Sequence, residues 1–170
     1  MKEALAWEPI PDYEEWWTPF DDRFAFKPKY EPARPPGITE PAGSVTFSLA
    51  PFCQTGIESR FAAGVSALNA EVLRALVQVF PEDELLVVLD WQHLGYRFRP
   101  HAHAAGDEAW RVSPFPDGDY YIFLTEDLGS GTFGHPWEQS LCVFGAALVD
   151  ALAPTLATWL SVLRRGGSPV

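Results

Sequence analysis

The sequence predicts an α+β fold, with a central, mainly antiparallel sheet of about four to five strands. A long helix is expected after the first strand, and a C-terminal helix is expected to pack on one face. Two observations support this. Short apolar runs alternate with turn residues in the middle of the chain, as in antiparallel sheets. Helical repeats of apolar residues lie before and after this region.

Residues 1–44 are predicted to form an extended arm that wraps an α+β core at residues 45–167, within one domain. Half of the sixteen prolines lie in this arm, and such a density excludes a long helix. A short helical turn is expected at residues 12–17. The many Trp and Phe side chains between the prolines favour packing against the core over the alternative, a flexible tail.

Residues 45–50 (VTFSLA) alternate as a half-buried strand does. Thr55 and Glu58 have the spacing of a capping box, which predicts a helix start. Apolar residues then recur at helical spacing at Phe61, Val65, Leu68, Val72, Leu76 and Val79. Pro81 ends this pattern, so a long helix is expected between the first and second strands.

Four more strands are expected at residues 85–90, 96–99, 120–125 and 140–144, where apolar or alternating runs lie between turn residues. Residues 101–108 are expected to form a polar loop. Leucine and tryptophan then recur at helical spacing from Gly145 onward, which predicts a terminal helix. Pro154 would kink or restart this helix, and Gly166 with Gly167 would end it.

The net charge of −11 argues against nucleic acid and anionic membranes as partners, because only twelve Lys and Arg residues are present. A basic protein partner or a small-molecule ligand fits this charge better. The sequence shows neither an apolar run of about 18 residues nor a signal-peptide pattern, so we expect a cytoplasmic protein. Cys53 and Cys142 match no metal-ligand pattern and are expected to be reduced, buried and structural.

Gly129, Gly131 and Gly134 spell GxGxxG directly after a predicted strand. A dinucleotide site would need a helix to begin at these glycines. Glu126 and Asp127 precede them and would repel a pyrophosphate, so no cofactor is predicted. We expect the glycines to supply positive φ for a wide loop.

His135 and Glu138 form the first candidate catalytic pair. On a helical turn begun by Pro136 the two side chains would share a face. A carboxylate beside an imidazole can tune a general base, but the same pair can also stabilise a loop by hydrogen bonding. Both interpretations stay open.

Asp90 and His93 are the second candidate catalytic pair, because they lie where a predicted central strand ends in a turn with Trp91. If this strand neighbours residues 120–125, Asp90 and His93 approach Glu126, Asp127 and His135. Such a group has the composition of a metal or acid–base site. The spacing matches no metal motif within the predicted elements, so no metal is predicted.

The runs LLVVLDWQHLGYRFRP and PDGDYYIFLTEDLGSGTFGHPWEQSLCVFG resemble an uncharacterised family of bacterial domains of unknown function. The characteristic segments are DWQH followed by Y-x-F-x-P, then GDYYIFL, GTFGHPWE and VFG. The resemblance extends from Trp16 to Arg165. It implies a single bacterial domain of this length, and it implies no activity and no catalytic residues.

The favoured hypothesis is a small acidic cytosolic binding protein, for example an antitoxin or an immunity protein. Its binding loop would present Asp119, Glu126, Asp127 and Trp137 to a basic partner. The alternative is a small-molecule hydrolase in which His135 is the general base, oriented by Glu138 or Asp90 and assisted by His93. A third possibility is a structural or oligomeric subunit.

Overall fold

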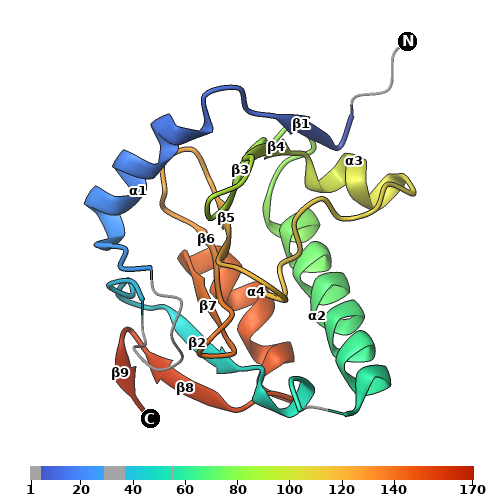
Figure 1. Ribbon diagram of the computed structural model, residues 1–170, viewed down its shortest axis with the longest axis vertical. Coiled ribbons are helices and arrows are strands. Elements are labelled where there is room, and N and C mark those ends of the chain that lie inside the picture. The colour runs from blue at the N-terminus through green and yellow to red at the C-terminus, as the bar shows by residue number, and fades with distance from the viewer. Residues whose placement is uncertain (1–4, 29–36, 55) are drawn as a thin grey trace.

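A computed structural model describes residues 5–28, 37–54 and 56–170. Within these residues, nine strands form one antiparallel sheet in the order β1-β4-β3-β5-β6-β7-β2-β8-β9 (Figure 1). The strands are β1 (Trp7–Pro9), β2 (Val45–Ser48), β3 (Leu86–Asp90), β4 (Tyr96–Phe98), β5 (Tyr121–Leu124), β6 (Gly131–His135), β7 (Ser140–Phe144), β8 (Val162–Arg165) and β9 (Ser168–Pro169). The helices are α1 (Trp17–Phe24), α2 (Glu58–Val79), α3 (Pro100–Ala105) and α4 (Ala146–Leu156), with 3-10 turns η1 (Tyr13–Trp16) and η2 (Ala50–Phe52).

This architecture shows that the predicted fold was wrong. The sheet has nine strands instead of four to five, the long helix α2 follows the second strand, and helices lie on both faces. The unpredicted strands are β1, β6, β8 and β9. The first and last are edge strands of three and two residues, too short to show an alternating pattern. Strand β6 contains two glycines, which weaken any strand propensity.

The C-terminal helix is also shorter than predicted, because α4 ends at Leu156 and the chain returns as strand β8. Pro154 lies in the last turn of α4 and has no N–H to donate. The residues beyond it find backbone partners in β2 instead, with Thr46 opposite Arg164. The apolar spacing there suits both a helix and a strand, and the sheet partner decides between them.

The first face of the sheet is covered by α2 and α4 (Figure 1). Leucine and valine side chains of both helices are fully buried against aromatic and valine side chains of the central strands. The buried leucine and valine residues of these helices are Leu68, Val72, Leu76, Leu148, Leu152 and Leu156. The apolar periodicity of both helices is therefore explained by this half of the core.

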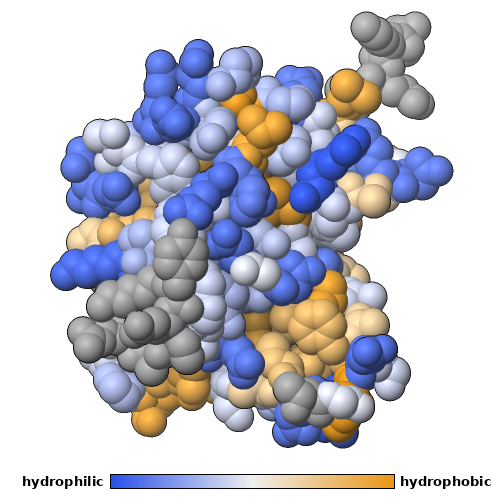
Figure 2. Space-filling model, viewed as in Figure 1, coloured by the Kyte–Doolittle hydropathy of each residue, from blue (hydrophilic) through white to orange (hydrophobic). Residues whose placement is uncertain are grey.

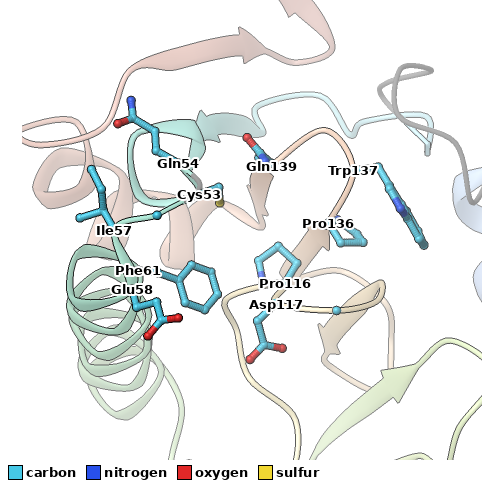
Figure 3. Close-up of a pocket in the computed structure, with 12 residues that line it drawn as sticks. Cys53, Gln54, Ile57, Glu58, Phe61, Pro116, Asp117, Pro136, Trp137 and Gln139 are labelled. Atoms are coloured by element: carbon cyan, nitrogen blue, oxygen red, sulfur yellow. The ribbon is translucent and has the colours of Figure 1, made fainter.

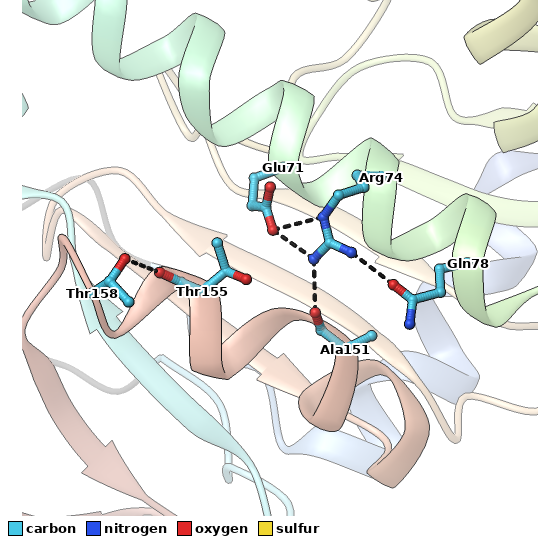
Figure 4. A network of polar contacts seen from close by, with 6 residues as sticks. All are labelled: Glu71, Arg74, Gln78, Ala151, Thr155 and Thr158. Carbon is cyan, nitrogen blue, oxygen red and sulfur yellow. Dashed lines mark hydrogen bonds and ion pairs between the residues drawn. The ribbon is translucent and has the colours of Figure 1, made fainter.

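Arg74 joins the two helices at the surface (Figure 4). Its guanidinium donates to Glu71 and Gln78 on its own helix, and Nη2 donates to the carbonyl oxygen of Ala151 in α4 at 2.8 Å. An exposed network of this kind contributes about 0.5 kcal/mol. The network therefore links α2 to α4 but adds little to the stability of the fold.

The second face is covered by α1 and the described residues that flank it. Phe20 and Phe24 of α1 are fully buried, and Phe24 packs on Phe144 of the sheet with ring centroids 5.2 Å apart. Trp7 of β1, by contrast, packs on the first face, against Phe98 and His103. Because both faces of the sheet are covered, its central strands read as continuous apolar runs rather than as alternating ones.

Helix α2 begins at Glu58, and its N-cap residue Ile57 makes no side-chain capping hydrogen bond. Thr55, the other half of the predicted capping box, lies outside the described residues. The first turns of α2 are held instead by Phe52, whose ring lies so close to Gly64 that a Cβ there would overlap it. Glycine at this position therefore allows η2 to pack on the helix.

Candidate functional site

Asp90, His93 and Asp119 form a group of polar side chains, which we name the Asp–His cluster, at the end of β3. Asp90 is the last residue of β3, where it pairs with Tyr121 of β5. In the turn that follows, the backbone N–H of His93 donates to the carbonyl oxygen of Asp90. The His93 Nδ1 lies 2.9 Å from Asp90 Oδ1 and 3.8 Å from Asp119 Oδ2. The sequence analysis expected Asp90 and His93 to approach Glu126, Asp127 and His135, but the acidic residue beside them is Asp119. Asp90 pairs with Tyr121 at the start of β5, whereas Glu126 and Asp127 follow the other end of that strand.

The carboxylates of this cluster are poorly compensated. Burial raises the pKa of Asp90, the hydrogen bond from His93 lowers it, and the nearby charges of Asp119 and Asp117 raise it further. Burial likewise raises the pKa of Asp119, against the effect of a backbone hydrogen bond from Tyr120. Among the described residues, His93 is the only basic side chain within ion-pair distance of Asp90 or Asp119.

His93 itself is exposed, with 63% of its side chain accessible to solvent. The hydrogen bond to Asp90 raises the pKa of His93, so the imidazole takes up a proton more readily than a free histidine. The three ligand atoms of the cluster lie within 4.8 Å of one another. Two carboxylates and an imidazole at this separation suit a divalent cation such as Zn²⁺ or Mn²⁺, and they equally attract an ammonium or guanidinium group.

Asp117 extends the acidic surface beside the cluster. Tyr121 hydrogen-bonds to Asp117, and burial together with the surrounding carboxylates raises the pKa of Tyr121 above its ordinary value. The phenol therefore stays protonated and donates to the Asp117 carboxylate. No sequence pattern singled out Asp117 beyond its place in a turn.

His135 occupies a different environment. It lies in β6 with 2% of its surface exposed, and its ring packs against Tyr120 at a centroid distance of 4.9 Å. The backbone N–H of Glu138 donates to His135 Nδ1 at 3.1 Å. Burial, and then the charge of Arg164, lower the pKa of His135 to about 4, so the ring is neutral at pH 7.

The Glu138 carboxylate binds Arg164, not the His135 ring. Glu138 Oε1 lies 2.6 Å from Arg164 Nη1, and Arg164 also donates to Glu40 at 2.8 and 2.9 Å. All three charged side chains are largely buried. His135 therefore contacts the backbone of Glu138. The Glu138 side chain belongs to a separate ion-pair network with Arg164. Sequence reasoning missed Glu40 and Arg164, because residues 162–165 were assigned to a helix.

The remaining residues of the predicted binding loop are dispersed. Glu126 forms an ion pair with Arg97 of β4. Asp127 stabilises its own turn, accepting from the Thr125 hydroxyl at 2.6 Å and the Gly129 N–H at 2.9 Å. These hydrogen bonds lower the pKa of Asp127. Trp137 packs on Tyr120 with ring centroids 5.1 Å apart.

The GxGxxG glycines do not play the predicted conformational role. None of them has positive φ, and the loop takes its left-handed residue at Leu128 instead, with φ of 59°. Gly131 lies within β6, where a Cβ atom would overlap the carbonyl oxygen of Phe123 in the neighbouring strand. The absence of a side chain, and not φ, is what the structure requires at Gly131.

The fold and cluster together define a nine-stranded antiparallel sheet protein with an acidic site at the end of a central strand. Residues 10–149 match the family described as "Protein of unknown function (DUF2716)", and the chain belongs to this family. The predicted resemblance to a family of unknown function is thereby confirmed.

The "Uncharacterized protein YxiI" of Bacillus subtilis (strain 168) is 39% identical to this chain over 90 residues. The match covers 52% of this chain and 56% of the relative, so the chain spans little more than half the length of that protein. No solved structure matches the chain. Neither match assigns an activity. Within the part of the chain that the structure describes, each helix is too short or too polar to cross a lipid bilayer.

Proposed function

We propose that this protein is a small acidic cytoplasmic binding protein that recognises a basic protein partner, in the manner of an antitoxin or immunity protein. The observation that supports this most is the Asp–His cluster. Two carboxylates are held together there, and within the described residues no Lys or Arg pairs with them. A Lys or Arg side chain of a partner would supply the missing positive charge.

The electrostatics of the cluster favour this role. Burial, and then the nearby charges of Asp119 and Asp117, raise the pKa of Asp90, and a cation placed beside these carboxylates favours their ionised forms. The net charge of −11 adds a long-range attraction for a basic protein, which raises the association rate at low salt. Affinity and association rate should therefore depend on the same few aspartates.

The geometry gives less support to a small-molecule hydrolase centred on His135. A general base must come within hydrogen-bond reach of its substrate, and only 2% of the His135 surface is accessible. Its Nδ1 already accepts a backbone hydrogen bond. We therefore assign the binding role to the Asp–His cluster and a structural role to His135.

The proposal is tested with the double substitution Asp90→Asn and Asp119→Asn. The matched control is Asp107→Asn with Asp150→Asn, which removes the same charge at exposed positions outside the cluster. Partners captured by the wild type from cells that express it would be identified by mass spectrometry, and their association rates measured at 50 and 300 mM salt. We expect a basic partner whose association slows about tenfold in the cluster variant and less than about twofold in the control. Equal rates in both variants would refute the proposal.

A thermal-shift series with Zn²⁺, Mn²⁺ and Mg²⁺ separates this function from metal binding. Under our proposal the two double variants respond to these ions alike. A stabilisation of the wild type that only the Asp90→Asn, Asp119→Asn protein lacks would assign the cluster to a divalent cation instead.

A further inference from the structure

A cleft of about 440 Å³ lies beside the acidic surface, between the first turn of α2 and two turns of the chain (Figure 3). One turn comprises residues 116–118 and the other residues 136–139. The described residues that line the cleft are Cys53, Gln54, Gly56, Ile57, Glu58, Phe61, Pro116, Asp117, Gly118, Pro136, Trp137 and Gln139. Its volume is within the usual range for ligand sites, about 300–1,000 Å³.

The floor of the cleft is apolar and its rim is polar. The Phe61 ring and the ring of Pro116 face each other across the floor (Figure 3). Apolar surface gathers beside the N-terminal half of α2 on this face of the molecule (Figure 2). The carboxylates of Glu58 and Asp117 both lie at one side of the floor, and the amide of Gln139 lies at the other (Figure 3). Among the described lining residues there is no Lys or Arg, so the rim is negative.

We propose that this cleft binds an arginine side chain presented by a protein partner. The proposal rests on the proposed function, and it names the group that the acidic surface recognises. The aliphatic stem of arginine would lie along Phe61 and Pro116 while its guanidinium reaches the carboxylates of Glu58 and Asp117. Arginine side chains are frequent among the residues that contribute most to binding at protein interfaces.

Arginine fits this site better than lysine for two physical reasons. Its planar guanidinium presents five N–H donors in a fixed fork, which can bind two carboxylates together. It is also more weakly hydrated than an ammonium group and stacks favourably on aromatic rings such as Phe61. A lysine would place a strongly hydrated point charge against the same apolar floor.

The cleft and the Asp–His cluster share one short loop, residues 117–119. Asp117 lines the cleft and Asp119, two residues later, belongs to the cluster. The charge of Asp117 also acts on Asp90. An arginine in the cleft would therefore lie beside the carboxylates that attract the rest of a basic partner.

The cleft is preorganised, because contacts within the protein already hold Asp117 and Phe61 in position. Tyr121 hydrogen-bonds to Asp117 and orients its carboxylate. Phe61 packs edge-on against the buried Phe115, with ring centroids 5.5 Å apart. A preorganised site loses less conformational entropy on binding, which favours recognition of a single side chain.

The test uses two synthetic peptides, acetyl-Ala-Leu-Arg-Leu-Ala-amide and the same peptide with citrulline in place of arginine. Citrulline keeps the shape of arginine and removes its charge. Binding to the full-length protein is measured by ¹H–¹⁵N NMR titration. We expect the arginine peptide to bind at least about tenfold more tightly than the citrulline peptide, with shifts at Phe61 and Asp117.

Three variants complete the test, and their melting temperatures verify that each is folded. Asp117→Asn and Glu58→Gln are each expected to weaken arginine-peptide binding about tenfold, because each removes one charged acceptor. Asp150→Asn, an exposed charge on α4, is the matched control and should change it less than twofold. Equal binding of both peptides, or an equal effect of all three variants, would overturn the assignment.

The peptide assay needs no natural partner, so the two proposals can fail separately. A captured basic partner that is unaffected by Asp117→Asn and Glu58→Gln would remove the arginine site and keep the proposed function. Specific binding of the arginine peptide, with no basic partner captured, would remove the proposed function and retain the cleft as an arginine site.

Discussion

His135 should make the stability of the fold depend on pH between about 6.5 and 4. Burial and the charge of Arg164 lower its pKa from 6.5 to about 4 in the folded protein. The unfolded chain therefore binds a proton first as the pH falls, and protonation favours unfolding. The stability due to the neutral, buried ring is fully present above pH 6.5 and is lost as the pH falls towards 4.

The magnitude follows from the two pKa values. At pH 5 the unfolded histidine is almost fully protonated, whereas about a tenth of the folded molecules carry the proton. This difference lowers the free energy of unfolding by about 2 kcal/mol relative to pH 7.5. In urea it corresponds to a fall of about 1 M in the midpoint, for an m-value of about 2 kcal/mol per M.

Urea titrations of the wild type and His135→Asn at pH 7.5 and 5.0 measure this effect. Asparagine does not titrate, and its side-chain oxygen can accept the Glu138 N–H that His135 Nδ1 accepts now. Other groups, including the buried His103, titrate in both proteins, so the difference between the two pH dependences isolates His135. If His135→Asn loses as much stability as the wild type on going to pH 5, the lowered pKa of His135 is refuted.

Three further substitutions test the core and the buried charges. Phe20→Ala should lower the free energy of unfolding by about 3–5 kcal/mol in urea titrations, because it leaves a cavity under α1 where Phe20 is fully buried. Arg164→Met should lower it by about 3–5 kcal/mol, since Glu40 and Glu138 would be left buried without a cation, and adding Glu40→Gln should restore part of the loss. Gly131→Ala should lower the melting temperature by at least about 5 °C, since its Cβ would overlap the β5 backbone. A loss below about 1 kcal/mol in any of the three would contradict the packing described.

The sequence identified elements where a single apolar pattern continued long enough. Strands β2, β3, β4, β5 and β7 lie within the residues predicted for strands, and α2 covers the strongest helical repeat. Strands β1 and β9 were missed because they have three and two residues and depend on hydrogen bonds from their neighbours. Strand β8 was missed because the sequence VLRR suits a helix as well as a strand. Only its pairing with β2, where Thr46 lies opposite Arg164, decides between the two. Long-range pairing of this kind leaves no local pattern.

The candidate site was predictable to a similar extent. Asp90 and His93 were placed together because both lie where a predicted central strand ends in a turn, and the β3–β5 pairing then adds Asp119. The partner of Glu138 was not predictable, since Arg164 lies 26 residues away on a strand that the sequence did not indicate. Local spacing finds neighbours within a turn, and ion pairs between distant strands need the sheet topology.

In the proposed interface, the segment from His135 to Gln139 holds one wall of the cleft in place. His135 accepts the Glu138 N–H, and Glu138 is held by Arg164, which is itself bound to Glu40. These buried contacts fix the turn that supplies Pro136, Trp137 and Gln139 to the cleft. His135 can therefore matter for binding without touching a ligand. If it does, His135→Asn should weaken arginine-peptide binding at pH 7.5 by no more than about threefold, whereas Asp117→Asn should weaken it about tenfold. A complete loss of binding in folded His135→Asn would instead place His135 at the ligand.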